Sequence, residues 1–337
     1  MNNGHVKIFF FVLILFVYVN DKVLTTEHEA DNAASSKTTI SKITPSETPS
    51  FGTASFETVV PKITQPMFIV LTNPPSPHIA SIPVIFELDS VYKKSKRLLC
   101  PDIAEIKKAK EVMDEAVTLL QYHATTEDSY KYHCTSPQGI KIYCRKDRRS
   151  PSIGKCQFQI SNPNKYYDII DILWDPNGPQ NFDPSFVSGK VVRSYNRNLL
   201  MVLKLHRNAA LSSTRYFYAL VKKAQISEDT TIIVMASGNI NDHNPFNKKT
   251  YKNKVLESIN SFNTNVDFDE DVKNGYYKKT FVNLSGYLIR KKNDHVDVTF
   301  VNSMDFNVSF SLKSFVKNPN IEAMQNILSL QSYFDNQ

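Results

Sequence analysis

Four acidic side chains form the group in this sequence that most resembles a metal-binding loop. They are Asp267, Asp269, Glu270 and Asp271. A calcium loop needs a glycine at its sharp turn and a bidentate glutamate at its end, whereas this chain has Val272 and Lys278 at those positions. We therefore interpret the cluster as a solvated loop. His243, within Asn-Asp-His, is the histidine that looks most like a site residue, and a polar turn explains it equally well.

The motifs of common enzyme active sites are absent from the sequence. It has no glycine-rich phosphate loop, no Gly-x-Ser-x-Gly elbow and no His-Glu-x-x-His helix. No residue is identified as a nucleophile, and no catalytic residue, metal or cofactor is expected. The sequence therefore predicts a protein that is not an enzyme.

The cysteines lie in the first third of the region that looks folded. They are Cys100, Cys134, Cys144 and Cys156. Secretion would permit disulfides between them, and three connectivities are possible. Cys134 and Cys144 flank a turn-like Ser-Pro-Gln-Gly sequence, which favours a cross-strand contact between them, and the connectivity stays open. A zinc site is not favoured because no Cys-x-x-Cys occurs.

Extended runs rich in β-branched and aromatic residues dominate the second half of the chain. They cover residues 189–205, 215–225, 230–237 and 279–301. Turn residues separate these runs, so they predict one antiparallel sheet. Residues 319–334 then carry apolar side chains at near-helical spacing, which predicts a terminal amphipathic helix that packs on the sheet. A curved sheet closed by a helix encloses volume.

Further elements precede these runs or interrupt them. We expect a helix at 101–122, half-buried strands at 139–146 and 154–160, a short helix at 165–174, and a polar insertion at 246–271 with a helical piece at 255–262. The resulting order of helices and antiparallel strands is that of an α+β fold.

The N-terminal part of the chain is predicted to lie outside the folded domain. Lys7 precedes an apolar run at residues 8–19, which is shorter than the about 20 residues that span a bilayer and fits a secretory leader. We interpret residues 1–20 as a signal peptide, with an uncleaved membrane anchor as the alternative. Residues 21–96 are rich in Ser, Thr and Pro and predict a disordered spacer. The folded domain is expected at 97–337.

The chain is basic, with a formal net charge of +7 and a pI near 9.0. This charge favours anionic membranes or polyanions over acidic partners. Two short basic groups stand out, although such runs are more often solvated loops than binding sites. They are Lys93, Lys94, Lys96 and Arg97, and Arg145, Lys146, Arg148 and Arg149. No basic repeat with interleaved aromatic residues occurs, so no nucleic-acid partner is expected.

Several segments, in collinear order, resemble the fam-a proteins of malaria parasites (Plasmodium, rodent-malaria type), which contain a START-like (StAR-related lipid transfer) domain. The segments are YYDIIDILWDP at 166–176, RYFYAL at 215–220, ISEDTTIIVM at 226–235 and KTFVNLSGYLI at 279–289. The leader and the Leu99-Cys100 pair are also similar to that family. The likeness extends over most of the chain.

The resemblance implies a START-like helix-grip fold, in which a curved antiparallel sheet wraps around a C-terminal helix. It implies a secreted or exported monomer that carries a phospholipid such as phosphatidylcholine in an internal tunnel and contacts membranes transiently. The location implied is the parasitophorous vacuole or the host erythrocyte. The alternative is a host-interaction or antigenic surface protein that uses the domain only as a scaffold. Bulky side chains that fill the tunnel would favour the scaffold, and an open cavity would favour the carrier.

A lipid headgroup in such a tunnel needs a few polar side chains in an apolar wall. Alternation along the strands places Val191, Arg193 and Tyr195 on one face, and it separates Arg215 and Phe217 from Tyr216 and Tyr218. Arg193 and Arg215 could pair a phosphate, and the tyrosines could hydrogen-bond it or enclose a choline ammonium. The alternative for each residue alone is an exposed arginine or a packed tyrosine.

Two further candidates follow from the resemblance to the START phosphatidylcholine carriers. It gives Asp183 the carboxylate on the headgroup side and places Ser285 toward the headgroup region. The basic residue that those carriers have shortly before this carboxylate falls near Pro179 here, which departs from their pattern. The predicted lipid-binding residues are Asp183, Arg193, Tyr195, Arg215, Tyr216, Tyr218, Ser285 and Tyr287.

Overall fold

A computed structural model describes the folded part of the chain. It covers residues 90–146, 151–208, 213–247, 250–308 and 319–336. The predicted signal peptide and nearly all of the predicted spacer lie outside the described residues.

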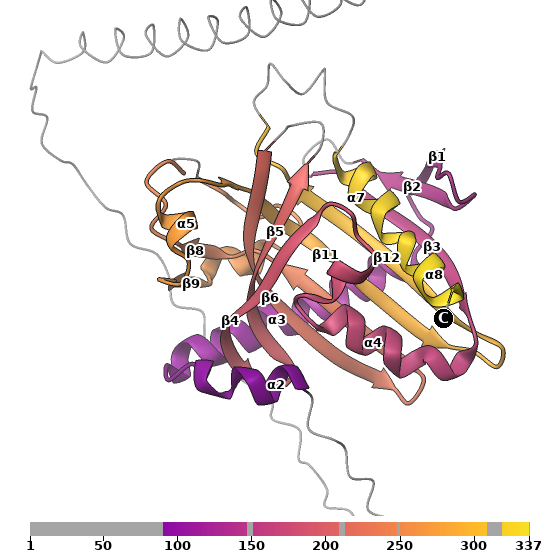
Figure 1. Cartoon of the computed structure of the whole chain (residues 1–337), viewed down its shortest axis with the longest axis horizontal. Helices are drawn as coiled ribbons and strands as arrows, with labels where there is room; N and C mark the ends of the chain where they lie inside the picture. Colours follow the sequence, from indigo (N-terminus) through magenta and orange to yellow (C-terminus); the bar gives the residue numbers. More distant parts are fainter. Residues whose placement is uncertain (1–89, 147–150, 209–212, 248–249, 309–318, 337) are drawn as a thin grey trace, which may run out of the picture. The chain divides into compact units, whose positions relative to one another are not determined.

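One curved, almost wholly antiparallel sheet organises the described residues (Figure 1). Its strands follow the order β1-β2-β3-β12-β11-β7-β6-β5-β4, and the short β10 pairs in parallel with β6. A separate parallel pair, β8 and β9, lies outside it. The strands are β1 (Lys131–Thr135), β2 (Lys141–Arg145), β3 (Ile153–Ser161), β4 (Phe186–Asn196), β5 (Leu199–Asn208), β6 (Ser213–Ser227), β7 (Thr230–Ala236), β8 (Asn239–Asn241), β9 (Asn263–Asn265), β10 (Lys278–Lys279), β11 (Phe281–Lys291) and β12 (His295–Asp305).

Both faces of the sheet are apolar, and each is covered by a different layer. On β6, Phe217 and Ala219 belong to one core cluster, whereas Tyr216 and Tyr218 belong to the other. This division follows from the two-residue repeat of a strand. The central strands are buried on both sides, as β11 is along most of its length. The sequences of these strands are therefore nearly continuously hydrophobic.

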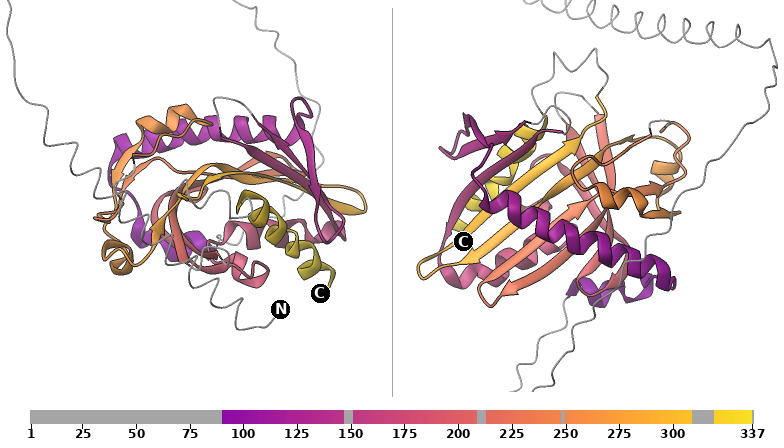
Figure 2. Two further views of the ribbon diagram at one scale, coloured as in Figure 1. Left: turned by 90° about the horizontal axis from the view of Figure 1, so that it is seen from above. Right: turned by 180° about the vertical axis from the view of Figure 1, so that it is seen from behind.

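The convex face is covered by the long helix α3 (Ile103–Thr125) (Figure 2). Asp102 caps its first turn by accepting hydrogen bonds from the backbone N–H groups of Ala104 and Glu105 at 2.8 and 3.1 Å. The insertion after β7 extends this layer through Leu256, Phe262 and other apolar side chains. Its elements are β8, the 3₁₀ helix η5 (Glu257–Ser261), β9 and α5 (Glu270–Lys273).

The concave face is covered by shorter helices. Figure 2 shows the C-terminal segment lying in the hollow of the sheet, opposite α3. Met324, Ile327, Leu330 and Phe334 of this segment are buried in the concave core. The covering elements are α2 (Ser90–Ser95) with η2 (Lys96–Leu98), η3 (Pro163–Lys165) with α4 (Tyr166–Trp174), η4 (Gly178–Asn181), α7 (Pro319–Ile327) and α8 (Ser329–Asp335).

The predicted α+β fold, a curved antiparallel sheet around a C-terminal helical segment, is confirmed. Several details differ from the expectation. The runs 189–205 and 279–301 are each a hairpin rather than one strand, and the first turns at Asn198, whose N–H bonds to the side chain of Asn196 at 2.8 Å. The terminal helix is interrupted at Leu328. The helix α2 packs Val91 into the core, so folded structure begins before residue 97.

The cysteines of the described residues are free thiols. Cys134 and Cys144 are not directly paired across the hairpin, because a bulge in β1 places Ile142 opposite Cys134 and Lys131 opposite Cys144. Burial raises the pKa of Cys144, and the two thiols are nevertheless close enough for Cys134 to contribute to this rise. Three of the four side chains are buried. Among the helices that the structure describes, none combines the length and the apolar composition needed to cross a membrane.

Two glycines in the sheet region provide a test of the packing. A Cβ atom on Gly286, in the central strand β11, would lie 2.2 Å from the carbonyl oxygen of Ile233, which belongs to the backbone and cannot yield. We expect Gly286→Ala to lower the free energy of unfolding by about 3 kcal/mol. Urea denaturation followed by circular dichroism measures it.

Gly139, in the turn between β1 and β2, is the matched control. It has φ +82°, and an added Cβ would meet nothing within 4 Å. Gly139→Ala should therefore cost only the left-handed backbone penalty of about 1 kcal/mol. Equal losses in the two variants would contradict the close approach of β11 and β7.

Candidate functional site

A cavity of about 70 Å³ lies on the concave face, between the ends of the central strands and α7. Its lining includes the polar residues Asp183, His206, Arg215 and Glu322, and the apolar residues Phe217, Met304 and Phe306. Pockets that hold drug-sized ligands usually measure roughly 300–1,000 Å³, so this cavity has room for a few water molecules only. The structure therefore describes a small, partly open pocket in which a few polar groups meet a mainly apolar lining.

Arg215 is a buried cation that no described carboxylate neutralises. Its side chain shares the concave face with Phe217 and is 5% exposed. One Nη donates a hydrogen bond to the carbonyl oxygen of Phe306, whereas Nε has no partner among the described residues. Burial lowers the pKa of Arg215. Because an unsatisfied buried donor costs roughly 1–3 kcal/mol, this position favours a hydrogen-bond acceptor.

Asp183, Lys204 and His206 add further titratable groups beside the cavity. Nδ1 of His206 lies 3.8 Å from the carboxylate of Asp183. Burial lowers the pKa of His206 to about 4, an effect that Asp183 opposes and Lys204 reinforces. Burial also lowers the pKa of Lys204 to about 8, against the attraction of nearby aspartates. At neutral pH, His206 is therefore uncharged, and its ring stacks on Phe217 with the centroids 5.8 Å apart.

Two predicted residues of β11 share this face. Tyr287 stacks on Phe300 with ring centroids 4.9 Å apart, and burial followed by the charge of Asp183 raises the pKa of its hydroxyl. Ser285 is 4% exposed and lies directly opposite Met235, which belongs to the concave core. Directly paired residues point to the same side of a sheet, so Ser285 faces the concave layer as well.

The rest of the concave face is apolar and strongly aromatic. Its large buried side chains include Phe158, Tyr166, Trp174, Phe182, Phe217 and Phe300. Trp174 is 3% exposed, and its indole Nε1 has no hydrogen-bond partner in the described part of the chain. Lys223 lies over its ring, 4.9 Å from the centroid. Along β6, the face runs from Arg215 at one end to Lys223 near Trp174 at the other.

Arg193 and Tyr195 point to the convex side instead. Nη1 of Arg193 donates to both carboxylate oxygens of Glu105 on α3, at 2.7 and 2.8 Å. The hydroxyl of Tyr195 donates to the same carboxylate at 2.6 Å, as does that of Thr264 in β9 at 3.0 Å. This paired cluster joins α3, β4 and the insertion.

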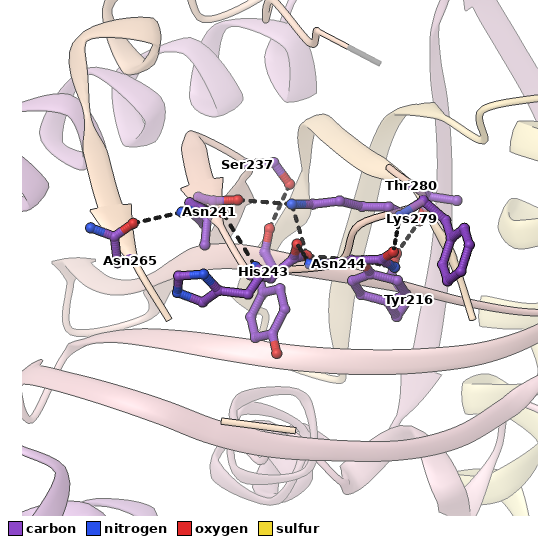
Figure 3. A network of polar contacts seen from close by, with 12 residues as sticks. Tyr216, Ser237, Asn241, His243, Asn244, Asn265, Lys279 and Thr280 are labelled. Carbon is purple, nitrogen blue, oxygen red and sulfur yellow. Dashed lines mark hydrogen bonds and ion pairs between the residues drawn. The ribbon is translucent and has the colours of Figure 1, made fainter. Parts of the chain in front are cut away.

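Tyr216 and Tyr218 also face the convex layer. Figure 3 shows Tyr216 in a polar network with residues of the insertion. The hydroxyl of Tyr216 donates to Asp242 at 2.9 Å and accepts from Asn244 at 3.0 Å. Nζ of Lys279 lies 2.8 Å from the same carboxylate, and both side chains of this ion pair are nearly inaccessible to solvent. The charges of the network satisfy one another.

The structure thus divides the eight predicted residues between two faces. Asp183, Arg215, Ser285 and Tyr287 lie on the concave side, whereas the other four lie on the convex side. The expected pairing of Arg193 and Arg215 with one phosphate is wrong, because the sheet separates them. The expected shared face of Val191 and Tyr195 is also wrong, because bulges in β4 interrupt the alternation. Direct contact of the eight residues with lipid stays a prediction.

Sequence reasoning missed Lys204 and His206. They stand in Leu-Lys-Leu-His-Arg, where two polar residues alternate with buried leucines inside an otherwise apolar run. Such alternation puts both side chains on one face of the strand, and this signal could have identified them. Among the described residues, no group of three or more His, Cys, Asp or Glu side chains is placed to hold a metal ion.

Comparisons with known proteins found similar structures but no similar sequences. Neither the protein-family models nor the curated proteins gave a match. Human STARD10 is similar with a TM-score of 0.48 and 13% identity, covering 66% of this chain and 80% of that one. Human StAR-related lipid transfer protein 5 is similar with a TM-score of 0.47 and 12% identity, covering 68% and 97%. These likenesses concern the arrangement of the chain, and the function proposed below does not depend on them.

The titration of His206 tests the electrostatics of the cavity. By NMR of the ring protons, we expect a pKa of about 4 for His206. Asp183→Asn removes the charge that favours imidazolium and should lower this pKa further. Lys204→Met removes a repelling cation and should raise it.

His123 provides an internal control for both variants. It lies on α3, and burial together with the charges of Arg145 and Lys155 lowers its pKa to about 4 as well. Its titration should not move in either variant. A His206 pKa near 6.5 in the unmodified protein, or an upward shift in Asp183→Asn, would contradict the assignment.

Proposed function

We propose that the protein binds one lipid molecule on the concave face of the sheet and carries it between membranes without bond-making chemistry. The observation that carries this proposal is Arg215, a buried guanidinium with an unpartnered Nε at one end of an otherwise apolar wall. An anionic oxygen of a lipid, such as a phosphate oxygen, would satisfy this donor by a charge-assisted hydrogen bond.

The wall has the length and character that an acyl chain needs. From Arg215, the concave side of β6 continues through Phe217, Ala219 and Val221, and six residues of strand span about 20 Å. Each methylene buried against such a surface is worth about 0.8 kcal/mol, so a carrier must enclose the chain. The polar end and the apolar wall together match an amphipathic ligand.

Loading requires the concave layer to open, because the cavity of about 70 Å³ cannot hold an acyl chain. We propose that α7 and α8 form the lid. They contact the sheet through the apolar side chains of Met324, Ile327 and Leu330. The side chain of Asn320 adds hydrogen bonds to Asn302 and Met304 of β12, which opening would have to break. Gly154 of β3 allows α7 to approach, since a Cβ there would lie 2.4 Å from Sδ of Met324. A lid of this kind can separate from the sheet without breaking the strand ladder.

The leader at residues 1–20 and the fam-a resemblance motivate a proposed location outside the parasite, in the parasitophorous vacuole or the host erythrocyte. The protein would work there as a monomer that meets membranes transiently. Its cargo is proposed to be a phospholipid such as phosphatidylcholine, whose phosphate would bind Arg215. An epitope-tagged chain imaged in infected cells tests the location, and retention inside the parasite would contradict it.

A second function, a host-interaction scaffold, is favoured by one observation. Large aromatic side chains, among them Phe158, Trp174 and Phe300, are buried together on the concave face, and none of these three lines the cavity. A protein without cargo has no need for an opening lid. The two functions differ in whether lipid can displace the lid, which the next experiment tests.

Trp174 is the only tryptophan of the chain and reports on the concave face. We expect phosphatidylcholine with brominated acyl chains, delivered from cyclodextrin, to quench its fluorescence in a saturable manner, because an enclosed chain would reach the aromatic wall. Arg215→Gln should weaken the affinity by about tenfold to a hundredfold, as a hydrogen bond to a charged group is worth roughly 1.5–3 kcal/mol.

Arg197→Gln is the matched control, since it removes the same charge from the exposed turn at the other end of the β4–β5 hairpin. Its affinity should equal that of the unmodified protein. Arg215→Gln should also keep its stability towards urea, because it removes a buried charge that has no carboxylate partner. The absence of quenching in the unmodified protein would favour the scaffold function. Equal affinities of the two variants for the lipid would show that Arg215 does not bind it.

A further inference from the structure

The basic group that precedes α3 is presented on the surface by an anchored helix. In α2, Val91 and Ser95 are buried at 8% and 1% exposure and fix the helix on the core. The four basic side chains between and after them are exposed. They are Lys93, Lys94, Lys96 and Arg97. The four basic side chains therefore belong to a helical segment that is fixed on the core, and together they form a cationic surface.

Two large apolar side chains follow this group and are also exposed. Leu99 is 49% exposed and Ile103, the first residue of α3, is 81% exposed. The backbone beneath them is fixed, because Leu99 bridges to Ser194 of β4 and the N–H of Cys100 donates to the carbonyl oxygen of Ser194 at 2.8 Å. At most about 3.6 Å of chain per residue separates these side chains from the basic group, so they belong to the same end of the molecule. Figure 2 shows α2 and the start of α3 at that end.

The acidic groups beside this surface are already engaged. Asp102 accepts the two backbone hydrogen bonds that cap α3. Glu105 accepts hydrogen bonds from Arg193, Tyr195 and Thr264. The four exposed basic side chains outnumber these two carboxylates, so the net charge of the surface is positive. We call this surface the basic edge and define it by Lys93, Lys94, Lys96, Arg97, Leu99 and Ile103.

We propose that the basic edge docks the protein on an anionic lipid bilayer. The four cations would lie at the headgroups, where each is worth about 1 kcal/mol near an anionic surface. Leu99 and Ile103 would enter the boundary between headgroups and acyl chains, as the apolar residues of interfacial helices do. A polyanion such as a nucleic acid would use the charges but not these two side chains.

This inference rests on the proposed lipid transfer, because a carrier must meet the membranes that it serves. It deepens that proposal by naming the surface that makes the contact and the lipid charge that it selects. The surface and the cavity use different residues, so they can be tested separately.

The test is co-sedimentation of the full chain with vesicles of phosphatidylcholine alone and of phosphatidylcholine mixed with phosphatidylserine. We expect binding to the mixed vesicles only. Replacing the four basic residues of the basic edge by Gln should weaken this binding by about 100-fold or more. Replacing Leu99 and Ile103 by Ser should weaken it severalfold without changing its dependence on salt.

The matched control removes four exposed lysines elsewhere in the folded part. They are Lys131, Lys141, Lys146 and Lys292, each replaced by Gln. This variant has the same net charge as the basic-edge variant and should keep most of the binding. An equal loss in both variants would overturn the proposal in favour of a general charge effect. Heparin binding that depends on the four cations, with no effect of Leu99→Ser and Ile103→Ser on vesicle binding, would overturn it in favour of a polyanion site.

The outcomes also separate this inference from the proposed function. Loading from cyclodextrin, as reported by Trp174, needs no vesicle. A protein that loads lipid but does not bind the mixed vesicles overturns the docking surface and leaves the lipid site. A protein that binds these vesicles through the basic edge but never loads lipid supports the docking surface and overturns the carrier.

Discussion

The structure depends on one constraint, the need to cover both apolar faces of a single curved sheet. Apolar surface removed from water is worth about 25 cal/mol per Å², so neither face of the central strands can stay exposed. The long helix α3 and the insertion cover the convex face, and four short helices with the η4 turn cover the concave one. A layer built from short pieces is easier to displace than one built on a long helix, because each piece carries fewer contacts.

The charged groups buried in the two layers differ in a way that follows from this division. On the convex side, Arg193 pairs with Glu105 and Lys279 pairs with Asp242, so the desolvation cost of each charge is offset. On the concave side, Arg215 is 5% exposed, and no described carboxylate neutralises it. Paired charges stabilise the convex layer, whereas the unsatisfied donor of Arg215 is the position at which we propose that a ligand binds. This contrast is why the proposed site lies in the concave layer.

The sequence predicts the elements of this fold well because their signals are local. The alternation in β2 and β3, the one-sided apolar pattern of α3 and its Asp102 cap are all contained within short segments. The assignment of side chains to faces succeeded for β6, which runs regularly from Arg215 to Val221. It failed for β4, where bulges beside Arg193 interrupt the two-residue repeat, and nothing in the local sequence announces them.

Only some residues of the candidate site could be predicted, because the site also depends on contacts between segments that are distant in the sequence. Asp183 and Arg215 are far apart in sequence and come together through the pairing of β5 with β6, which no local pattern specifies. The cavity could not be anticipated either, since its size depends on how Phe217, Met304 and α7 pack together.

The central claim is that the concave face takes up a lipid when the C-terminal helices move away. Native mass spectrometry of the full secreted chain, purified without added detergent, tests it most directly. The account predicts a population heavier by the mass of one phospholipid, with that lipid recovered by extraction. A protein that carries no lipid, and gains none after incubation with phospholipid, would contradict the account.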